Sequence, residues 1–98
     1  MKLKTESGSI YEILDRGNVM KNNVFMFSYQ LLGSIHPRFV TYSPKPHIRD
    51  YEQLKTTPTQ FEVGDLLIFQ KKAATGDNER KLHISAKIKK IKGGLVKY

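Results

Sequence analysis

The chain has 98 residues, of which 39% are hydrophobic and 10% aromatic, and its formal net charge at pH 7 is +8. This length suffices for one hydrophobic core but not for two, so we predict a single domain over residues 1–98. The absence of cysteine excludes disulfides, thiolate metal sites and cysteine nucleophiles, and it is typical of proteins of a reducing cytosol.

Polar residues interrupt the longest uncharged stretch, residues 22–37. Such a stretch cannot cross about 30 Å of hydrocarbon, so we expect no membrane span. The first residues include lysines but no apolar segment of an export signal, and we therefore expect a cytoplasmic protein. Chains of this size often bury more apolar surface against a copy of themselves, so we expect a homo-oligomer, with a dimer favoured.

Short apolar runs bounded by Gly, Asn, Pro and Asp recur about every ten to fifteen residues, which predicts an all-β or mainly β fold, a small antiparallel barrel or sandwich. Two strands are predicted at residues 2–6 and 10–14, joined by a turn at Gly8. Further turns are predicted at residues 15–18 and at Asn22-Asn23.

Residues 24–32 are apolar on both phases of the strand alternation, which predicts a central strand with both faces covered. Residues 38–42 form another predicted strand, and two prolines end it. Apolar side chains three residues apart then predict one short helix near residues 48–55.

The second half begins with a pair of strand segments over residues 61–69, with a bend or bulge at Gly64-Asp65 that leaves Phe61 and Val63 on one face. Residues 66–72 and 80–91 are then predicted to pair as a hairpin around an exposed loop at 73–79. Residues 82–88 alternate strictly. The alternation predicts that Leu82, Ile84, Ala86 and Ile88 point inward and that His83, Ser85, Lys87 and Lys89 point outward.

The positive charge is unevenly distributed along the chain. Residues 1–69 carry eight Lys/Arg and seven Asp/Glu, whereas residues 70–98 carry nine Lys/Arg and two acidic residues. Clustered positive charge attracts polyanions, so nucleic acid, nucleotides or an acidic protein surface are the expected partners. The alternative is a solvated face that keeps the protein soluble.

No motif of a known catalytic site occurs in the sequence. There is no GxxxxGK[ST], HExxH or GxSxG and no recognisable pair of carboxylates. The three histidines lack the spacing of zinc ligands. We therefore predict that the protein is not an enzyme and that it holds neither a metal nor a cofactor.

The main candidate site is a basic stripe in the last third of the chain. If the predicted hairpin forms, its charges meet on one sheet face and around its ends, where ammonium and guanidinium groups can bind phosphates. Lysines on exposed strands also serve to prevent aggregation, which is the alternative. The stripe comprises Lys71, Lys72, Arg80, Lys81, His83, Lys87, Lys89, Lys90 and Lys92.

A second candidate is the loop at residues 41–51, which combines Tyr42, Lys45 and Arg49 with His47, Tyr51 and two prolines. Aromatic and cationic side chains in one segment can stack on a base and hold its phosphate. The alternative is that the tyrosines anchor a long connection to the core.

The opening residues Thr5-Glu-Ser-Gly-Ser-Ile-Tyr-Glu-Ile13 resemble those of short β-rich accessory proteins of tailed phages. The run Ile84-Ser-Ala-Lys-Ile-Lys-Lys-Ile91 resembles the strand on which such chains end. The match covers about a quarter of the chain, and these proteins are mostly of unknown function. It implies a phage origin, a small β fold and the host cytoplasm as the location, but no site residues.

Small phage proteins of this kind often act against host defences, so our first hypothesis is a counter-defence protein. It would bind a nucleotide signal in a closed pocket, or DNA or RNA in an open groove, through the basic C-terminal face. The second hypothesis is an inhibitor that binds a host defence or metabolic enzyme through a strand edge or the charged face.

Overall fold

The computed structural model describes residues 1–15, 17–72 and 81–92. Their regular structure is mainly β, as predicted, and a seven-stranded antiparallel sheet has the order β4-β3-β2-β1-β9-β8-β5. A separate small sheet pairs β6 with β7. The strands are β1 (Lys2–Thr5), β2 (Ile10–Ile13), β3 (Val19–Lys21), β4 (Val24–Phe25), β5 (Tyr29–Ile35), β6 (Val40–Thr41), β7 (His47–Ile48), β8 (Leu66–Lys71) and β9 (Leu82–Lys92).

The helical segments are single 3₁₀ turns: η1 (Pro37–Phe39), η2 (Tyr51–Gln53) and η3 (Pro58–Gln60). Of the helix predicted near residues 48–55, only η2 forms, and the Asp50 carboxylate caps it by accepting the Glu52 N–H at 3.1 Å. Within the described residues, no helix is long and apolar enough to cross a membrane.

The first four strands form a meander. Strands β1 and β2 are where the sequence predicts them, and the turn between them uses Gly8 with φ +90°. The turn predicted at Asn22-Asn23 is also confirmed, with φ values of +51° and +66°. Two central residues with positive φ are the mark of the tight hairpin turn in which asparagine is favoured. This turn pairs β4 with β3, a strand that the apolar pattern does not predict.

The predicted central strand at residues 24–32 is wrong. A turn, in which the Tyr29 N–H donates to the Met26 carbonyl at 3.4 Å, separates β4 from β5. Val24 and Phe27 are 67% and 75% exposed. The apolar residues at 24–27 therefore mark the exposed sheet edge at β4 and the turn after it, whereas residues 29–32 begin β5, where Leu31 is buried.

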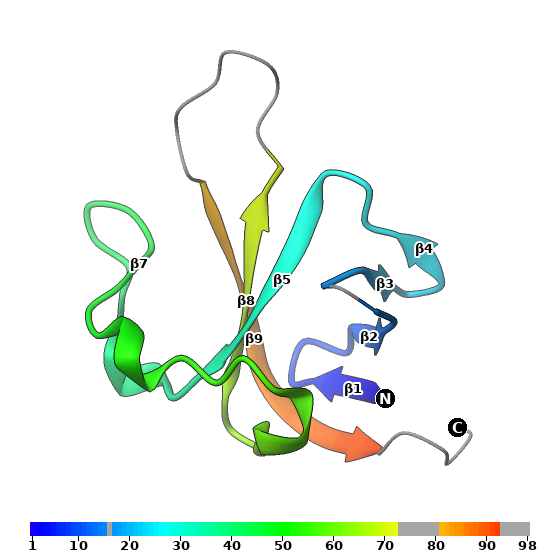
Figure 1. Cartoon of the computed structure of the whole chain (residues 1–98). Coiled ribbons are helices and arrows are strands. Elements are labelled where there is room, and N and C mark those ends of the chain that lie inside the picture. The colour runs from blue at the N-terminus through cyan, green and yellow to red at the C-terminus, as the bar shows by residue number, and fades with distance from the viewer. Residues whose placement is uncertain (16, 73–80, 93–98) are drawn as a thin grey trace.

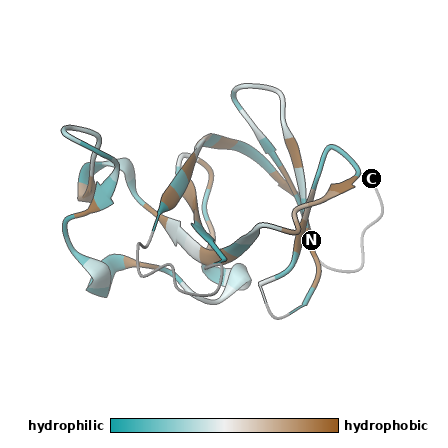
Figure 2. Ribbon diagram, turned by 90° about the horizontal axis from the view of Figure 1, so that it is seen from above, coloured by the Kyte–Doolittle hydropathy of each residue, from teal (hydrophilic) through white to brown (hydrophobic). Residues whose placement is uncertain are grey.

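The strand that is buried on both faces is β8, which has β5 and β9 as its neighbours. Its Leu67 and Phe69 join one core cluster with Leu3, Tyr11 and Val19. Its other face contributes to a second core cluster, which comprises Leu66, Ile68, Ile35, Val40 and Ile48. Accordingly, β1–β4 lie on one side of the β8–β9 pair and the β6–β7 segment on the other (Figure 1), and hydrophobic segments recur along the strands of the main sheet (Figure 2).

The hairpin predicted from residues 66–72 and 80–91 is confirmed in its pairing, but the strict alternation over residues 82–88 is wrong. Leu66 lies opposite Lys87 and Ile68 opposite Ile84, so β9 has an extra residue opposite Leu67. This β-bulge buries Ser85, whose Oγ accepts the Leu67 N–H at 2.9 Å. Bulges bend a strand and shift the side-chain phase beyond them. The loop predicted at 73–79 lies outside the described residues.

The strand pair predicted over residues 61–69 reduces to β8 alone. Phe61 is buried after η3, whereas Val63 is 64% exposed, so the two do not share a face. The bend at Gly64 is confirmed, with φ +96°. Likewise, the strand predicted at 38–42 is confined to β6, because η1 occupies the residues before it.

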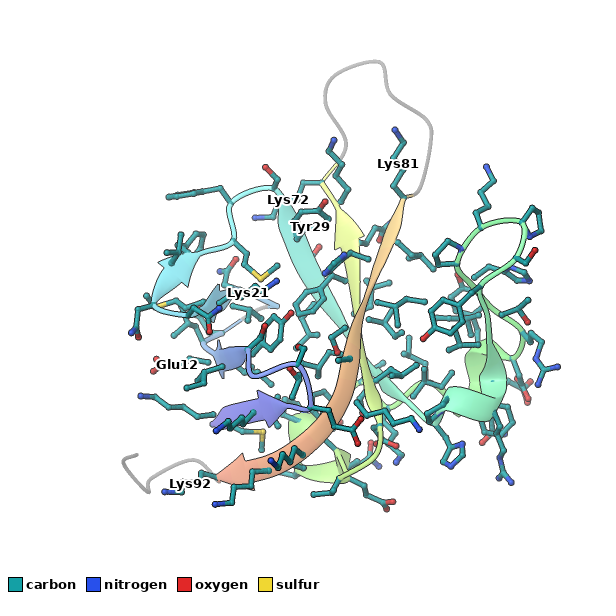
Figure 3. All side chains as sticks on the ribbon, turned by 180° about the vertical axis from the view of Figure 1, so that it is seen from behind. Glu12, Lys21, Tyr29, Lys72, Lys81 and Lys92 are labelled. Carbon is teal, nitrogen blue, oxygen red and sulfur yellow. The ribbon has the colours of Figure 1, made fainter. Side chains whose placement is uncertain are left out.

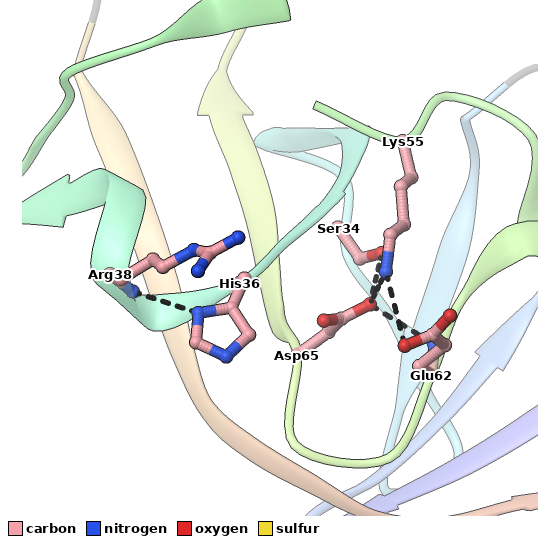
Figure 4. Close-up of polar contacts among 6 residues, drawn as sticks. All are labelled: Ser34, His36, Arg38, Lys55, Glu62 and Asp65. Atoms are coloured by element: carbon pink, nitrogen blue, oxygen red, sulfur yellow. Dashed lines mark hydrogen bonds and ion pairs between the residues drawn. The ribbon is translucent and has the colours of Figure 1, made fainter. Parts of the chain in front are cut away.

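A buried polar contact fixes the start of β8. Asp65 accepts hydrogen bonds from the Lys55 Nζ at 2.7 Å and from the Ser34 Oγ at 3.3 Å (Figure 4). The Glu62 N–H also donates to this carboxylate, at 3.0 Å. Gly33 permits the approach of the Lys55 backbone, since a Cβ there would lie 2.1 Å from the Lys55 carbonyl oxygen.

Candidate functional site

Three adjacent strand ends bring aromatic and basic residues into one row. Tyr29 of β5 lies opposite Lys71 of β8. The Lys71 N–H donates to the Lys81 carbonyl at 2.9 Å, which continues the β8–β9 register by one residue. Directly paired residues point to the same face of a sheet. The row therefore lies on the face that also carries Phe69 and His83, which are paired with each other.

The rings on this face form a continuous chain from the core to the surface. Tyr11 stacks on Phe69 with ring centroids 5.3 Å apart, and Phe69 lies 6.0 Å from the ring of His83. His83 in turn lies 5.7 Å from Tyr29. The inner two rings are buried, whereas Tyr29 is half-buried and His83 exposed. The packed rings thus hold two accessible rings in place.

Lys21 of β3 approaches this chain of rings. It lies opposite Tyr11 in the β2–β3 register, and its Nζ is 5.7 Å from the centroid of the Tyr11 ring, a cation–π contact. Partial burial of the ring, and then the positive charge of Lys21, lower the pKa of His83 from its ordinary value of 6.5. The ring is therefore mainly neutral at pH 7.

We call Lys21, Tyr29, Lys71, Lys81 and His83 the aromatic–lysine cluster. In Figure 3 the labelled members Tyr29 and Lys81 lie toward one end of the sheet, together with Lys72, and Lys21 lies between Tyr29 and Glu12. The Lys72 side chain is exposed, and its N–H donates to the Ser28 carbonyl at 2.8 Å. Arg80, another predicted site residue, lies outside the described residues.

The basic stripe does not lie on one sheet face, as the sequence predicts, because the bulges of β9 divide it. His83 pairs with Phe69, whereas Lys87 pairs with Leu66 and so faces the opposite side. Further along, Lys90 lies opposite Lys4, and Lys89 is the extra residue of a second bulge. We call the second group the outer lysine strip; it comprises Lys2, Lys4, Lys87, Lys90 and Lys92.

The outer lysine strip differs from the cluster in its surroundings. Glu12 of β2 lies opposite Lys2, so a carboxylate stands in the same row. Glu12 and Lys92 both lie far from Lys81 in Figure 3. The strip is a charged sheet surface, whereas the cluster combines charge with flat rings.

The predicted loop at residues 41–51 is on the other side of the sheet from the cluster. Its Arg49 guanidinium donates to the Arg38 carbonyl, and Tyr42 is exposed. Lys45 lines a pocket between this loop and the sheet, together with His47 and Tyr51. The loop therefore lies apart from the aromatic–lysine cluster.

Lys21 and Tyr29 are functional candidates that the sequence alone does not identify. A signal was present, because Asn22-Asn23 is a typical two-residue hairpin turn and would have placed Lys21 in a strand. Nothing local to the sequence indicates that β3 curls toward Tyr29 of β5. The same holds for Lys4, whose place beside Lys90 requires knowledge of the β1–β9 pairing.

The chemistry that the cluster offers is positive charge beside accessible aromatic surface. The neighbours that the structure records for the His83 ring are two other rings and Lys21. In the part of the chain that the structure describes, no three His, Asp or Glu residues gather closely enough to hold a metal ion. Lysine and aromatic side chains in this arrangement can bind phosphates and stack on bases.

Comparisons of the chain with protein-family models, with curated proteins and with solved structures found no match.

Proposed function

We propose that the protein binds single-stranded nucleic acid at the aromatic–lysine cluster and catalyses no reaction. One observation carries this proposal: strand pairing places Lys21, Lys71 and Lys81, from three separate segments, on the sheet face that carries the rings of Tyr29 and His83. Ammonium groups attract phosphates, and the exposed faces of aromatic rings stack on unpaired bases. A duplex offers no free base faces along its length, so the arrangement favours a single strand.

The resemblance to phage accessory proteins supports a setting for this activity. A phage-encoded protein that covers single strands in the host cytoplasm would hide them from a host defence that detects or cuts nucleic acid. The formal charge of +8 helps, because it speeds the encounter with any polyanion.

The test is a fluorescence titration with a short end-labelled oligonucleotide at several salt concentrations. For three phosphate contacts we expect a slope of log K against log salt of about −2, since each contact on a single strand contributes about −0.7. Lys71→Glu with Lys81→Glu should abolish binding, because two attractive charges become repulsive ones.

The matched control reverses the same number of charges in the outer lysine strip. Lys4→Glu with Lys90→Glu changes the net charge equally, and we expect affinity to fall by about threefold or less, because exposed charges beyond about 10 Å are screened by salt. Equal losses in the two double variants would mean that net charge alone drives binding. The proposal is overturned if the wild-type protein binds none of the oligonucleotides.

A second candidate function is inhibition of a host protein, and the edge strand β4 favours it. β4 ends the main sheet, so its outer backbone groups can pair with a strand of a partner. Exposed Val24 and Phe27 flank this edge, and the Phe27 ring lies 4.7 Å from that of Phe25. For this function, Phe27→Asp should abolish the complex with the host protein, while the cluster variants keep it.

A further inference from the structure

A pocket lies on the face of β5, β8 and β9 opposite to the aromatic–lysine cluster. Its volume is about 420 Å³, which is within the range of small-molecule sites. It opens between the sheet and the segment that carries β7 and η2. Its lining includes Leu32, Lys45, His47, Tyr51, Gln70 and Leu82.

The sheet side of the pocket is set by strand register. Gln70 and Leu82 are directly paired, so both side chains point away from the face that carries Phe69 and His83. Leu32, at the bulge of β5, adds apolar surface. Tyr51 of η2 is 59% exposed and lines the pocket from the loop side. A flat ring fits between apolar and aromatic surfaces of this kind.

Besides the Tyr51 phenol, the polar side chains of the pocket are one cation, one imidazole and one amide. The His47 Nδ1–H donates to the Lys45 carbonyl at 2.9 Å, so the Nε2 of this tautomer is an acceptor for another partner. Gln70 has both a donor and two acceptor lone pairs on its amide. The described lining residues include no carboxylate, so the charge of the pocket is positive.

We propose that this pocket binds an adenine nucleotide. The base lies against Tyr51 and the two leucines, and the Gln70 amide pairs with the adenine edge. Lys45 binds the phosphate, and the His47 Nε2 accepts a hydrogen bond from a ribose hydroxyl. Glutamine matches the donor and acceptor pattern of adenine N6 and N7. This site is independent of the proposed nucleic-acid site, from which the sheet separates it.

The test is a titration of the full chain with AMP, in which binding is measured from the backbone amide chemical shifts. We expect saturable shifts at His47, Tyr51, Gln70 and Leu82, and tighter binding of AMP than of adenosine, UMP or inorganic phosphate. Lys45→Ala should weaken AMP binding by about tenfold or more and leave adenosine binding unchanged, since one charge-assisted contact is lost. Gln70→Leu should remove the preference of the site for AMP over UMP.

The control variant is Lys71→Ala, which changes the other face and should leave AMP binding as in the wild type. Shifts confined to the cluster, a loss of AMP binding in Lys71→Ala, or no saturable shift would each overturn the proposal. Oligonucleotide titrations of Lys45→Ala separate the two sites, because Lys45 lies outside the cluster. If the cluster fails to bind nucleic acid, the AMP result still stands. A phosphorylated oligoadenylate that displaces AMP would assign the site to the end of a strand; otherwise the ligand is the free nucleotide.

Discussion

The two ends of the β8–β9 pair use lysine differently. At the start of β8, Lys55 contacts the buried carboxylate of Asp65 at 2.7 Å and the exposed carboxylate of Glu62 at 3.7 Å. At the other end, Lys71 is exposed beside Tyr29 and His83, and the nearby Lys21 lies over an aromatic ring. A lysine matched by an internal carboxylate holds the fold together, whereas a lysine beside open rings can bind an anion from solution.

The largest expected effect comes from removing the carboxylate that pairs with Lys55 at the start of β8. Asp65→Ala should lower the free energy of unfolding by about 2–4 kcal/mol, because it leaves the Ser34 hydroxyl, the Glu62 N–H and the Lys55 ammonium without their acceptor. Urea unfolding measures this change. Oligonucleotide affinity of the folded variant should equal that of the wild type.

Glu62→Gln is the matched control at the same end. The Glu62 carboxylate is 75% exposed, so its loss should cost less than about 0.5 kcal/mol. Wild-type stability of Asp65→Ala would show that the contact contributes nothing. Weaker oligonucleotide binding by the folded variant would show that the two ends are coupled.

The second-largest expected effect concerns the aromatic–lysine cluster. Tyr29→Ala should weaken oligonucleotide binding about tenfold, since one stacked base contributes roughly 1–3 kcal/mol. Tyr29→Phe keeps the ring and should stay close to the wild type. Tyr51→Ala removes an exposed tyrosine on the opposite face and should leave oligonucleotide binding unchanged. An equal effect of the two alanine variants, measured by the same titration, would contradict a local stacking site.

The turns of the fold, and the strand pairing that they set, could largely be predicted from the sequence. The turns at Gly8 and Asn22-Asn23 follow from residues that tolerate positive φ, and the pairing of β8 with β9 follows from the polar run between them. The bulge at Ser85 does not, because it depends on the contact of its hydroxyl with the Leu67 N–H of another strand. This bulge and the one at Lys89 together decide which lysines share a face.

The same limit applies to the candidate site. Lys71, Lys81 and His83 are close to one another because of a hairpin, which a local pattern predicts. Tyr29 and Lys21 arrive from β5 and β3, and only the curl of the whole sheet brings them near His83. Apolar periodicity reports which side of a strand is buried and contains no information about such curvature.

The smallest expected effect is a pH dependence from His83. Burial, followed by Lys21, lowers its pKa in the folded state below the ordinary 6.5. Above 6.5 both the folded and the unfolded chain hold a neutral ring, so His83 does not change stability there. As the pH falls below 6.5 the unfolded chain takes up the proton first, and the free energy of unfolding decreases until the folded form is protonated too. His83→Gln should remove this part of the loss in acid unfolding curves.

Ligand binding should reverse the shift, which ties this titration to the aromatic–lysine cluster. Phosphates beside the ring favour its cationic form, so a bound oligonucleotide should raise the pKa of His83, measured from its ring proton shifts. Lys21→Met should also raise this pKa without any ligand, because it removes a neighbouring positive charge. Lys4→Met removes a charge from the outer lysine strip and should leave it unchanged. An oligonucleotide that binds without moving the pKa of His83 would be bound elsewhere, and the two ends of β8–β9 would then not differ in the way proposed.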